Sequence, residues 1–470
     1  MGSRHVAQGS GGEDRGDGGR EQFSECGRAG DGLGRYVRSV PPAISDAHWR
    51  DEKGGSTQIT WMVAQDGKVQ TSPKGSFSFP YGAAALTRQL SEISLQKNAD
   101  SARSELEKTM KEQFSQAYQD LDLPESLLYK SLHGGLTLYL SGGGFRGWGY
   151  LLMSQHRIRP YPIPIINGFH VNKKEFQQTA NIQAVAAEES VFRISKRRAA
   201  QVPAVAFLVN VLVDALPVIQ EIRFCQGGVR EGFLFDTFDI STRATNPLCA
   251  ATAQYGPDSA AEIAEILWSG LPGKNHLDRS TPASFTPSLV RALADMMYVH
   301  SSLPKESRSL AALYAPITGL LASAHGISHS DRALLALTLC ERWHGEVPPP
   351  HDSMQTRLRA LLTPQEVFWS NYLGTLALLV GDIYPAGRVT TTPPRLQLSA
   401  KWAGGLGKKG MEQGVELVLT APKEDVMTAP AVLNPAVEKV EAVGKKKNRV
   451  GGKEYGFGVP IEISIQRVLE

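Results

Sequence analysis

The sequence predicts an α/β domain, an all-helical domain and a small β-rich C-terminal segment. Between residues 56 and 240, strand-like stretches alternate with helical apolar spacing, which is typical of layered α/β domains. Between about 257 and 382 only helical patterns follow one another. From Arg388 on, short β segments are separated by glycine and lysine stretches. The predicted division of the chain is 1–53, 54–242, 257–387 and 388–470.

Residues 1–53 are predicted to be disordered. The first 34 residues carry eleven glycines among Ser, Arg, Asp and Glu, a composition that buries too little apolar surface to offset the entropy of ordering the backbone. The stretch 47–50 is too polar for a buried strand. Organised structure is therefore expected from Ser56 on.

The apolar patterns place the elements of each segment. Residues 58–63 alternate as a strand does, Asp66-Gly67 is a hairpin turn, and 68–72 forms the return strand. The α/β segment then continues with helices 81–95 and 99–118, strand 136–140, helices 145–156 and 203–216, strand 219–225 and helix 229–238. The later expectations are helices 260–268, 288–300, 309–324, 331–343 and 366–379, then β segments 389–392, 395–398, 415–419 and 461–465.

Composition narrows the class of protein. A formal net charge of +3 gives no field that favours nucleic acid. The four cysteines, Cys26, Cys225, Cys249 and Cys340, form no CxxC pair, which argues against a zinc ribbon or a disulfide framework. Neither a signal-peptide core nor 18 unbroken apolar residues occur. We expect a cytoplasmic protein that contacts neither nucleic acid nor a membrane.

Residues 141–147, Ser-Gly-Gly-Gly-Phe-Arg-Gly, lie directly between a predicted strand and a predicted helix. Gly142, Gly143 and Gly144 would let the backbone approach an anion and point its N–H groups toward it, and the helix start adds positive charge. The spacing matches neither a Walker A loop nor a GxGxxG fingerprint. A tight turn without a ligand remains the alternative.

A second candidate is the turn formed by Gly54, Gly55, Ser56 and Thr57 at the start of the hairpin. Its hydroxyl and backbone donors could hold a phosphate without adding charge. A hairpin with no ligand is the alternative here too. By contrast, His325, His329 and Asp331 lie beside Gly326 and Ser328, which favours an inter-helix loop, and no metal site is predicted.

Several separated stretches of the sequence are similar to motifs of a single protein family. They are Gly-Gly-Ser-Thr-Gln-Ile-Thr-Trp at 54–61, Ser-Gly-Gly-Gly at 141–144, the basic-then-apolar stretch 193–204, the Arg-Glu-Gly segment within 214–234, and Thr-Thr-Thr-Pro-Pro-Arg-Leu at 390–396. Together they resemble the Ppx/GppA family of exopolyphosphatases and guanosine pentaphosphatases. This resemblance implies that 54–242 is the second lobe of an actin-like, ribonuclease H-like fold and that 257–387 is an HD-like helical domain. It makes 54–57 a phosphate-binding motif and 142–144 a nucleotide turn.

The amino-acid sequences of residues 78–86 and 142–150 are similar to those of fungal members of the family that are associated with mitochondria-to-nucleus signalling. In the family, a first lobe supplies another phosphate loop and the glutamate that positions the attacking water. Here Glu52 and Lys53 stand where an apolar residue and a glycine are expected, and only about fifty residues precede the motif. We therefore expect the first lobe to be missing, and no catalytic residue is assigned.

Three functions remain open at this stage. The first is a phosphatase-like regulatory protein that binds a nucleotide or polyphosphate and acts through signalling protein partners. The second is an active hydrolase of polyphosphate or guanosine pentaphosphate, which would use Mg²⁺. The third is a truncated product without activity. A homodimer is left open for each of them.

Overall fold

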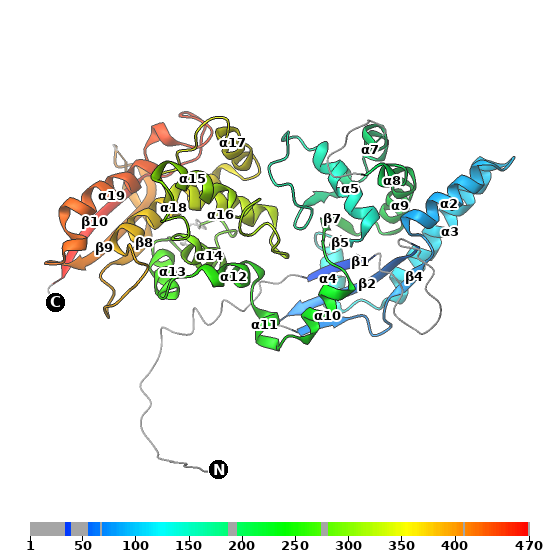
Figure 1. Ribbon diagram of the computed structural model, residues 1–470, viewed down its shortest axis with the longest axis horizontal. Helices are drawn as coiled ribbons and strands as arrows, with labels where there is room; N and C mark the ends of the chain where they lie inside the picture. Colours follow the sequence, from blue (N-terminus) through cyan, green and yellow to red (C-terminus); the bar gives the residue numbers. More distant parts are fainter. Residues whose placement is uncertain are drawn as a thin grey trace, which may run out of the picture.

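The computed structural model describes residues 33–38, 55–65, 68–186, 195–273, 281–407 and 409–468. Figure 1 shows two bodies, with the N-terminal α/β body on the right and the C-terminal body on the left. The predicted hairpin turn at 66–67 and the predicted disorder of 1–53, apart from 33–38, lie outside the described residues. No helix within the described ranges combines the length and the apolar character needed to cross a membrane.

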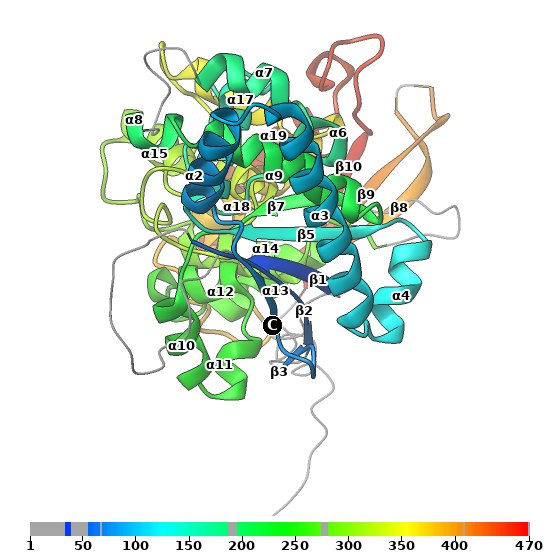
Figure 2. The ribbon, with the colours of Figure 1, turned by 90° about the vertical axis from the view of Figure 1, so that its right-hand side faces the viewer.

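The first body is built on a mixed sheet in the order β3-β2-β1-β5-β7-β6, with β4 paired to β2. Its strands are β1 (Leu33–Arg38), β2 (Thr57–Gln65), β3 (Lys68–Thr71), β4 (Phe77–Phe79), β5 (Leu136–Ser141), β6 (His170–Asn172) and β7 (Ile219–Phe224). Strands β1, β5 and β7 run parallel, whereas β2 is antiparallel to β1. Figure 2 shows these strands side by side behind α2 and α3. The carboxyl ends of three parallel strands therefore meet at one edge of the sheet.

Helices cover this sheet because their apolar faces and the alternating strands bury one another. Leu136, Leu138 and Leu140 of β5 are buried, while the residues between them are half-buried. The helices are α2 (Ala83–Ser94), α3 (Ala99–Asp120), α4 (Glu125–Leu132), α5 (Gly143–Ser154), α6 (Lys173–Phe176), α7 (Thr179–Ala186), α8 (Lys196–Ala199) and α9 (Val202–Ala215). After β7 the chain continues into α10 (Val229–Thr237) and α11 (Ile240–Ala244). Helix α9 is apolar along most of its length and packs against α2, α3, α5 and α7.

The second body joins helices to a three-stranded sheet in the order β10-β9-β8. Its elements are α12 (Pro247–Thr252), α13 (Ala260–Ser269), α14 (Pro287–Met296), α15 (Lys305–Tyr314), α16 (His329–Arg342), α17 (Asp352–Ala360), α18 (Pro364–Ile383), β8 (Gln397–Leu406), β9 (Glu412–Pro422), α19 (Pro430–Val443) and β10 (Ile461–Val468). Leu398, Leu417 and Leu419 of the sheet belong to the same core cluster as Leu376 of α18. The predicted boundary between 387 and 388 therefore does not separate two cores.

The long periodic elements are confirmed, with ends that shift by a few residues. Three expectations are wrong. Residues 33–38 form β1 inside the sheet, because pairing with β2 and β5 orders a strand that the glycine-rich composition does not reveal. Helix α15 spans Lys305–Tyr314 in place of 309–324, since Pro316 lacks the N–H that would continue it. Residues 389–392 are not a strand; two prolines follow them.

The two bodies meet at a small buried junction. An added Cβ on Gly168 would lie 2.2 Å from the carbonyl oxygen of Ile327, so the chains can approach this closely only at a glycine. Asn167 Oδ1 accepts a hydrogen bond of 2.9 Å from the Gly326 N–H. Tyr161 Oη lies 2.7 Å from Nδ1 of His329, which is 2% exposed. Burial lowers the pKa of His329 to about 3, so its ring is neutral where it shares this hydrogen bond with the Tyr161 hydroxyl.

We expect His329 to make the folded protein sensitive to acid. The unfolded state binds a proton near pH 6.5 and the folded state only near pH 3, so this contribution to stability is complete above pH 6.5 and is lost progressively below it. Between pH 7 and pH 5 the free energy of unfolding should fall by about 2 kcal/mol through this residue. Urea unfolding at both pH values, on the native chain and on His329→Gln, measures it.

The exposed His133 supplies the matched control, because His133→Gln should keep the pH dependence of the native chain. An equal loss of stability in the native chain and in His329→Gln would contradict the assignment.

Candidate functional site

The glycine-rich turn after β5 begins helix α5. Gly142, the N-cap residue, has φ +118°, which L side chains rarely adopt. Its N-cap residue, a glycine, has no side chain that could accept a hydrogen bond from the first backbone N–H groups of the helix. A helix start of this kind attracts anions through these donors and through the helix dipole.

Two more helix starts lie against it. An added Cβ on Gly144 would lie 3.1 Å from Cβ of Ala83 at the start of α2 and 3.3 Å from Cγ2 of Val205 near the start of α9. Neither α2, whose N-cap is Gly82, nor α9, whose N-cap is Gln201, has a side-chain cap. The positive ends of three helices, each of at least 12 residues, therefore converge.

A shallow depression of about 270 Å³, open solvent included, lies at this convergence. Its lining consists of Gly143, Gly144, Gly147, Trp148, Arg198, Gln201, Val202 and Val205. The Trp148 side chain is buried, and its Nε1 has no hydrogen-bond partner within the described ranges. The lining thus offers backbone N–H groups and one guanidinium but no carboxylate, a set that suits a phosphate group.

The other predicted turn lies next to this place. Gly54 is outside the described residues, whereas the carbonyl oxygen of Gly55 accepts a hydrogen bond of 3.3 Å from the Gly82 N–H. Because Ala83 contacts Gly144, the start of α2 bridges the two predicted turns. Ser56 is half-buried beside it.

Thr57 has a different role from the one that the sequence suggests. Its side chain is buried, and its hydroxyl donates a hydrogen bond of 2.9 Å to the carbonyl oxygen of Tyr81. In this structure the hydroxyl fixes the chain ahead of α2 and presents no donor to a ligand.

The turn after β7 borders the site on the other side. The hydroxyl of Ser141 lies 3.2 Å from the carbonyl oxygen of Gly227 and donates to it. Glu231 accepts a hydrogen bond of 2.7 Å from the Gly228 N–H, and backbone N–H groups, its own first and then that of Gly228, lower the pKa of its carboxyl group. Burial raises the pKa of the Cys225 thiol to about 11, so this thiol stays protonated. Glu231 thus caps its own helix, and Cys225 is a half-buried thiol.

The donor set does not fit Mg²⁺, which prefers oxygen ligands and carboxylates above all. Among the residues that the structure describes, no three His, Cys, Asp or Glu side chains gather as a metal site would require. His329 belongs to the junction with Tyr161, and Asp331 accepts a hydrogen bond of 2.7 Å from the Ser328 hydroxyl at the start of α16.

Sequence reasoning found the glycine turn but not its surroundings. Arg198 and Gln201 line the site because α9 packs against α5, and the start of α2 reaches it through the contact of Ala83 with Gly144. A weak signal was available, since Arg198 ends the basic run 196–198 just ahead of an apolar helix.

Comparison with known proteins divides the chain at the same place as the fold. Residues 50–240 match the model of the Ppx/GppA phosphatase family, and residues 246–468 match that of the RTG2 C-terminal domain. Retrograde regulation protein 2 of Saccharomyces cerevisiae is 32% identical over 445 residues, which cover 86% of this chain and 73% of that protein.

Solved structures of Ppx/GppA proteins from Aquifex aeolicus also match. The type II variant of the phosphatase is 16% identical with a TM-score of 0.29, and covers 45% of this chain. Another structure of the enzyme is 13% identical with a TM-score of 0.28, and covers 44% of this chain. The chain spans 58% and 57% of the lengths of these two structures.

The structural role of Thr57 leads to a prediction. Thr57→Val removes the donor and leaves the carbonyl oxygen of Tyr81 without it, so the free energy of unfolding should fall by about 1–3 kcal/mol. Urea unfolding measures this change. Thr60→Val is the control, because the Thr60 hydroxyl bonds to Gly75 at an exposed position, and it should cost less than about 0.5 kcal/mol. Equal effects of the two changes would contradict this role.

Proposed function

Because the chain belongs to the family of retrograde regulation protein 2, in which a Ppx/GppA phosphatase family domain precedes an RTG2 C-terminal domain, we propose that it is a regulatory phosphate-binding protein. It binds the phosphate groups of a nucleotide or polyphosphate where α2, α5 and α9 begin. It acts in mitochondria-to-nucleus retrograde signalling, in the cytoplasm and through protein partners. The single observation that carries the binding site is the convergence of three helix starts without side-chain caps beside Arg198.

The architecture of the first body supports the actin-like interpretation. An antiparallel β3-β2-β1 unit continues into parallel β5 and β7, which is the strand arrangement of a ribonuclease H-like sheet. In an open sheet of this kind, ligands bind outside the carboxyl ends of the parallel strands. The turn after β5 lies at that edge. We extend the proposal to an HD-like character for the helices of 257–387.

The chemistry of the lining favours binding over hydrolysis. Each helix start carries about half a positive charge, and a guanidinium forms charge-assisted hydrogen bonds with phosphate oxygens. Neither a carboxylate nor an imidazole lines the depression to activate water. Mg²⁺ would enter with the nucleotide, since the lining offers it no ligand. An active hydrolase is the alternative, in which a second lobe supplies the missing groups.

We expect Gly143→Val to abolish phosphate binding at the α5 depression without unfolding the protein. A Cβ added at Gly143 meets no atom within 4 Å, so the fold accommodates it, while the larger side chain fills the depression. Calorimetric titration with ATP, ppGpp and short polyphosphate in Mg²⁺ measures binding, and released phosphate is assayed in the same samples.

Gly404→Val is the matched control, because an added Cβ at Gly404 of β8 also meets no atom within 4 Å. It should bind as the native chain does. Saturable binding without phosphate release supports the regulatory proposal, and turnover supports the hydrolase. Unchanged binding in Gly143→Val would refute the assigned site.

The two neighbouring arginines of α8 separate a specific contact from general charge. Arg198 lines the depression and Arg197 does not, although both carry one positive charge. Arg198→Gln should raise the dissociation constant for polyphosphate by about tenfold to a hundredfold, the usual effect of losing a charge-assisted hydrogen bond. Arg197→Gln should change it by less than about twofold. If both variants bind equally weakly, the effect is one of net charge and the contact is not made.

A further inference from the structure

A second place gathers hydrogen-bond donors that lack acceptors. It lies in the C-terminal body, where α16 ends, with the guanidinium carbon of Arg342 at 4.3 Å from the ring centre of Trp343 and 5.9 Å from that of Tyr298. Arg342 is 4% exposed. Arg342 Nε, Trp343 Nε1 and the Tyr298 hydroxyl are all buried, and none has a hydrogen-bond partner within the described part of the chain. Buried donors are normally paired, so three together require an explanation.

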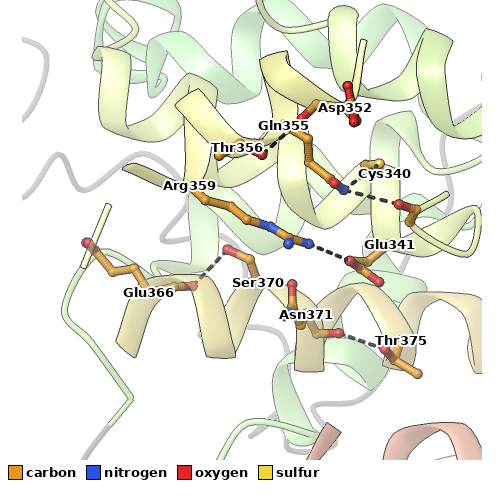
Figure 3. Close-up of polar contacts among 11 residues, drawn as sticks. Cys340, Glu341, Asp352, Gln355, Thr356, Arg359, Glu366, Ser370, Asn371 and Thr375 are labelled. Carbon is orange, nitrogen blue, oxygen red and sulfur yellow. Dashed lines mark hydrogen bonds and ion pairs between the residues drawn. The ribbon is translucent and has the colours of Figure 1, made fainter. Parts of the chain in front are cut away.

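Other arginines of the same body have partners for their Nη groups, although their Nε atoms lack one as well. The buried Arg332 donates to the carbonyl oxygens of Pro316, Leu321 and Ala324 at 2.6–2.8 Å. Figure 3 shows Arg359 of α17 pointing toward Glu341 of α16, at 3.4 Å.

Arg342 directly follows Glu341, yet no carboxylate of the described residues lies within 4.0 Å of it. Burial lowers the pKa of Arg342, which expresses the cost of a desolvated charge.

A second cation makes the site more unfavourable without an anion. The guanidinium carbon of Arg308, on α15, lies 5.0 Å from the same Trp343 ring, and its charge acts to lower the pKa of Arg342. Lys305 and Lys439 act in the same sense on the neighbouring His344. The carboxylate of Asp382 acts in the opposite sense, and its effect on the pKa of Arg342 is larger than that of Arg308. Three elements, α15, α16 and α19, thus bring positive charge to this place, and α18 brings the negative charge of Asp382.

Helix α18 holds the Arg342 fork in position. An added Cβ on Gly381 would lie 2.1 Å from Nη2 of Arg342, so the guanidinium lies against the helix where a side chain would otherwise be. The rings of Tyr298 and Trp343 confine the guanidinium group on other sides. A planar guanidinium fixed in this way loses little further entropy when it binds an oxyanion.

We propose that Tyr298, Arg308, Arg342 and Trp343, here called the Arg342 site, bind a phosphate group of a small molecule. Two guanidinium groups, a hydroxyl and an indole N–H need more acceptor oxygens than the two of a carboxylate, and a phosphate supplies them. This site is separate from the depression at α5. The proposal of this second site does not rest on the proposed function.

The test uses the full-length chain and tripolyphosphate, titrated calorimetrically at fixed ionic strength. Gly143→Val is the background, because it removes binding at the α5 depression, and the native chain is titrated in parallel. In that background a saturable site should remain. Adding Arg308→Gln should raise its dissociation constant by about tenfold to a hundredfold. Arg342→Lys, which keeps the charge but loses the fork, should weaken binding at least tenfold.

Arg308→Gln carries the test if Arg342→Lys fails to fold, since Arg308 is only half-buried. Lys401→Gln is the control for net charge, because Lys401 of β8 forms an ion pair with Glu416 at 3.3 Å. This change should leave the dissociation constant within twofold. Two results overturn the proposal: no saturable binding in the Gly143→Val background, or a dissociation constant that Arg308→Gln leaves within twofold. A Gly143→Val chain that binds as the native chain does, but loses binding with Arg308→Gln, refutes the α5 site alone.

Discussion

The close packing around helix α5 is the constraint on which the α/β body depends. An added Cβ on Gly149 would lie 2.5 Å from Cδ1 of Ile166 and 2.9 Å from Cδ1 of Phe224, so this helix reaches the sheet only at a glycine. Glycine inside a helix costs roughly 1 kcal/mol relative to alanine. Burial of large side chains on α5, Trp148 among them, offsets that cost. The same close approach brings the start of α5 against α2 and α9, where the proposed phosphate site lies.

Local patterns reveal the long elements of this fold and miss what only tertiary pairing creates. Helix α9 and strand β5 follow from apolar periodicity, whereas β1 is a short strand whose partners lie far along the chain. The glycine turn itself follows from sequence, because three consecutive glycines stand between a predicted strand and a predicted helix. Arg198 could not be assigned, since packing alone carries it there. Sequence does not tell which way the Thr57 hydroxyl points, and in the structure it donates to the carbonyl oxygen of Tyr81.

The junction between the bodies continues the same edge of the sheet. Backbone hydrogen bonds join Phe224, the last residue of β7, to Gly168 and Phe169, and Cys225 N–H donates to Leu140 at the end of β5. The loop that touches Ile327 and His329 is therefore one hydrogen-bonded strand away from the glycine turn before α5. A ligand that tightens this edge acts on a segment already attached to the C-terminal body. This gives the two bodies a physical connection, and coupling between them would have to be measured.

The two proposed phosphate sites attract an anion through different groups, and dissolved salt therefore affects them differently. At the start of α5 the donors are backbone N–H groups and one half-buried arginine beside open solvent, so dissolved salt screens the attraction within about a Debye length. At the Arg342 site the charge is buried between aromatic rings, where screening is weak and an unpaired cation is costly. The exposed site can therefore follow changes in phosphate concentration with little structural cost. The buried site stabilises the C-terminal body when its anion is bound, because only then is its charge paired.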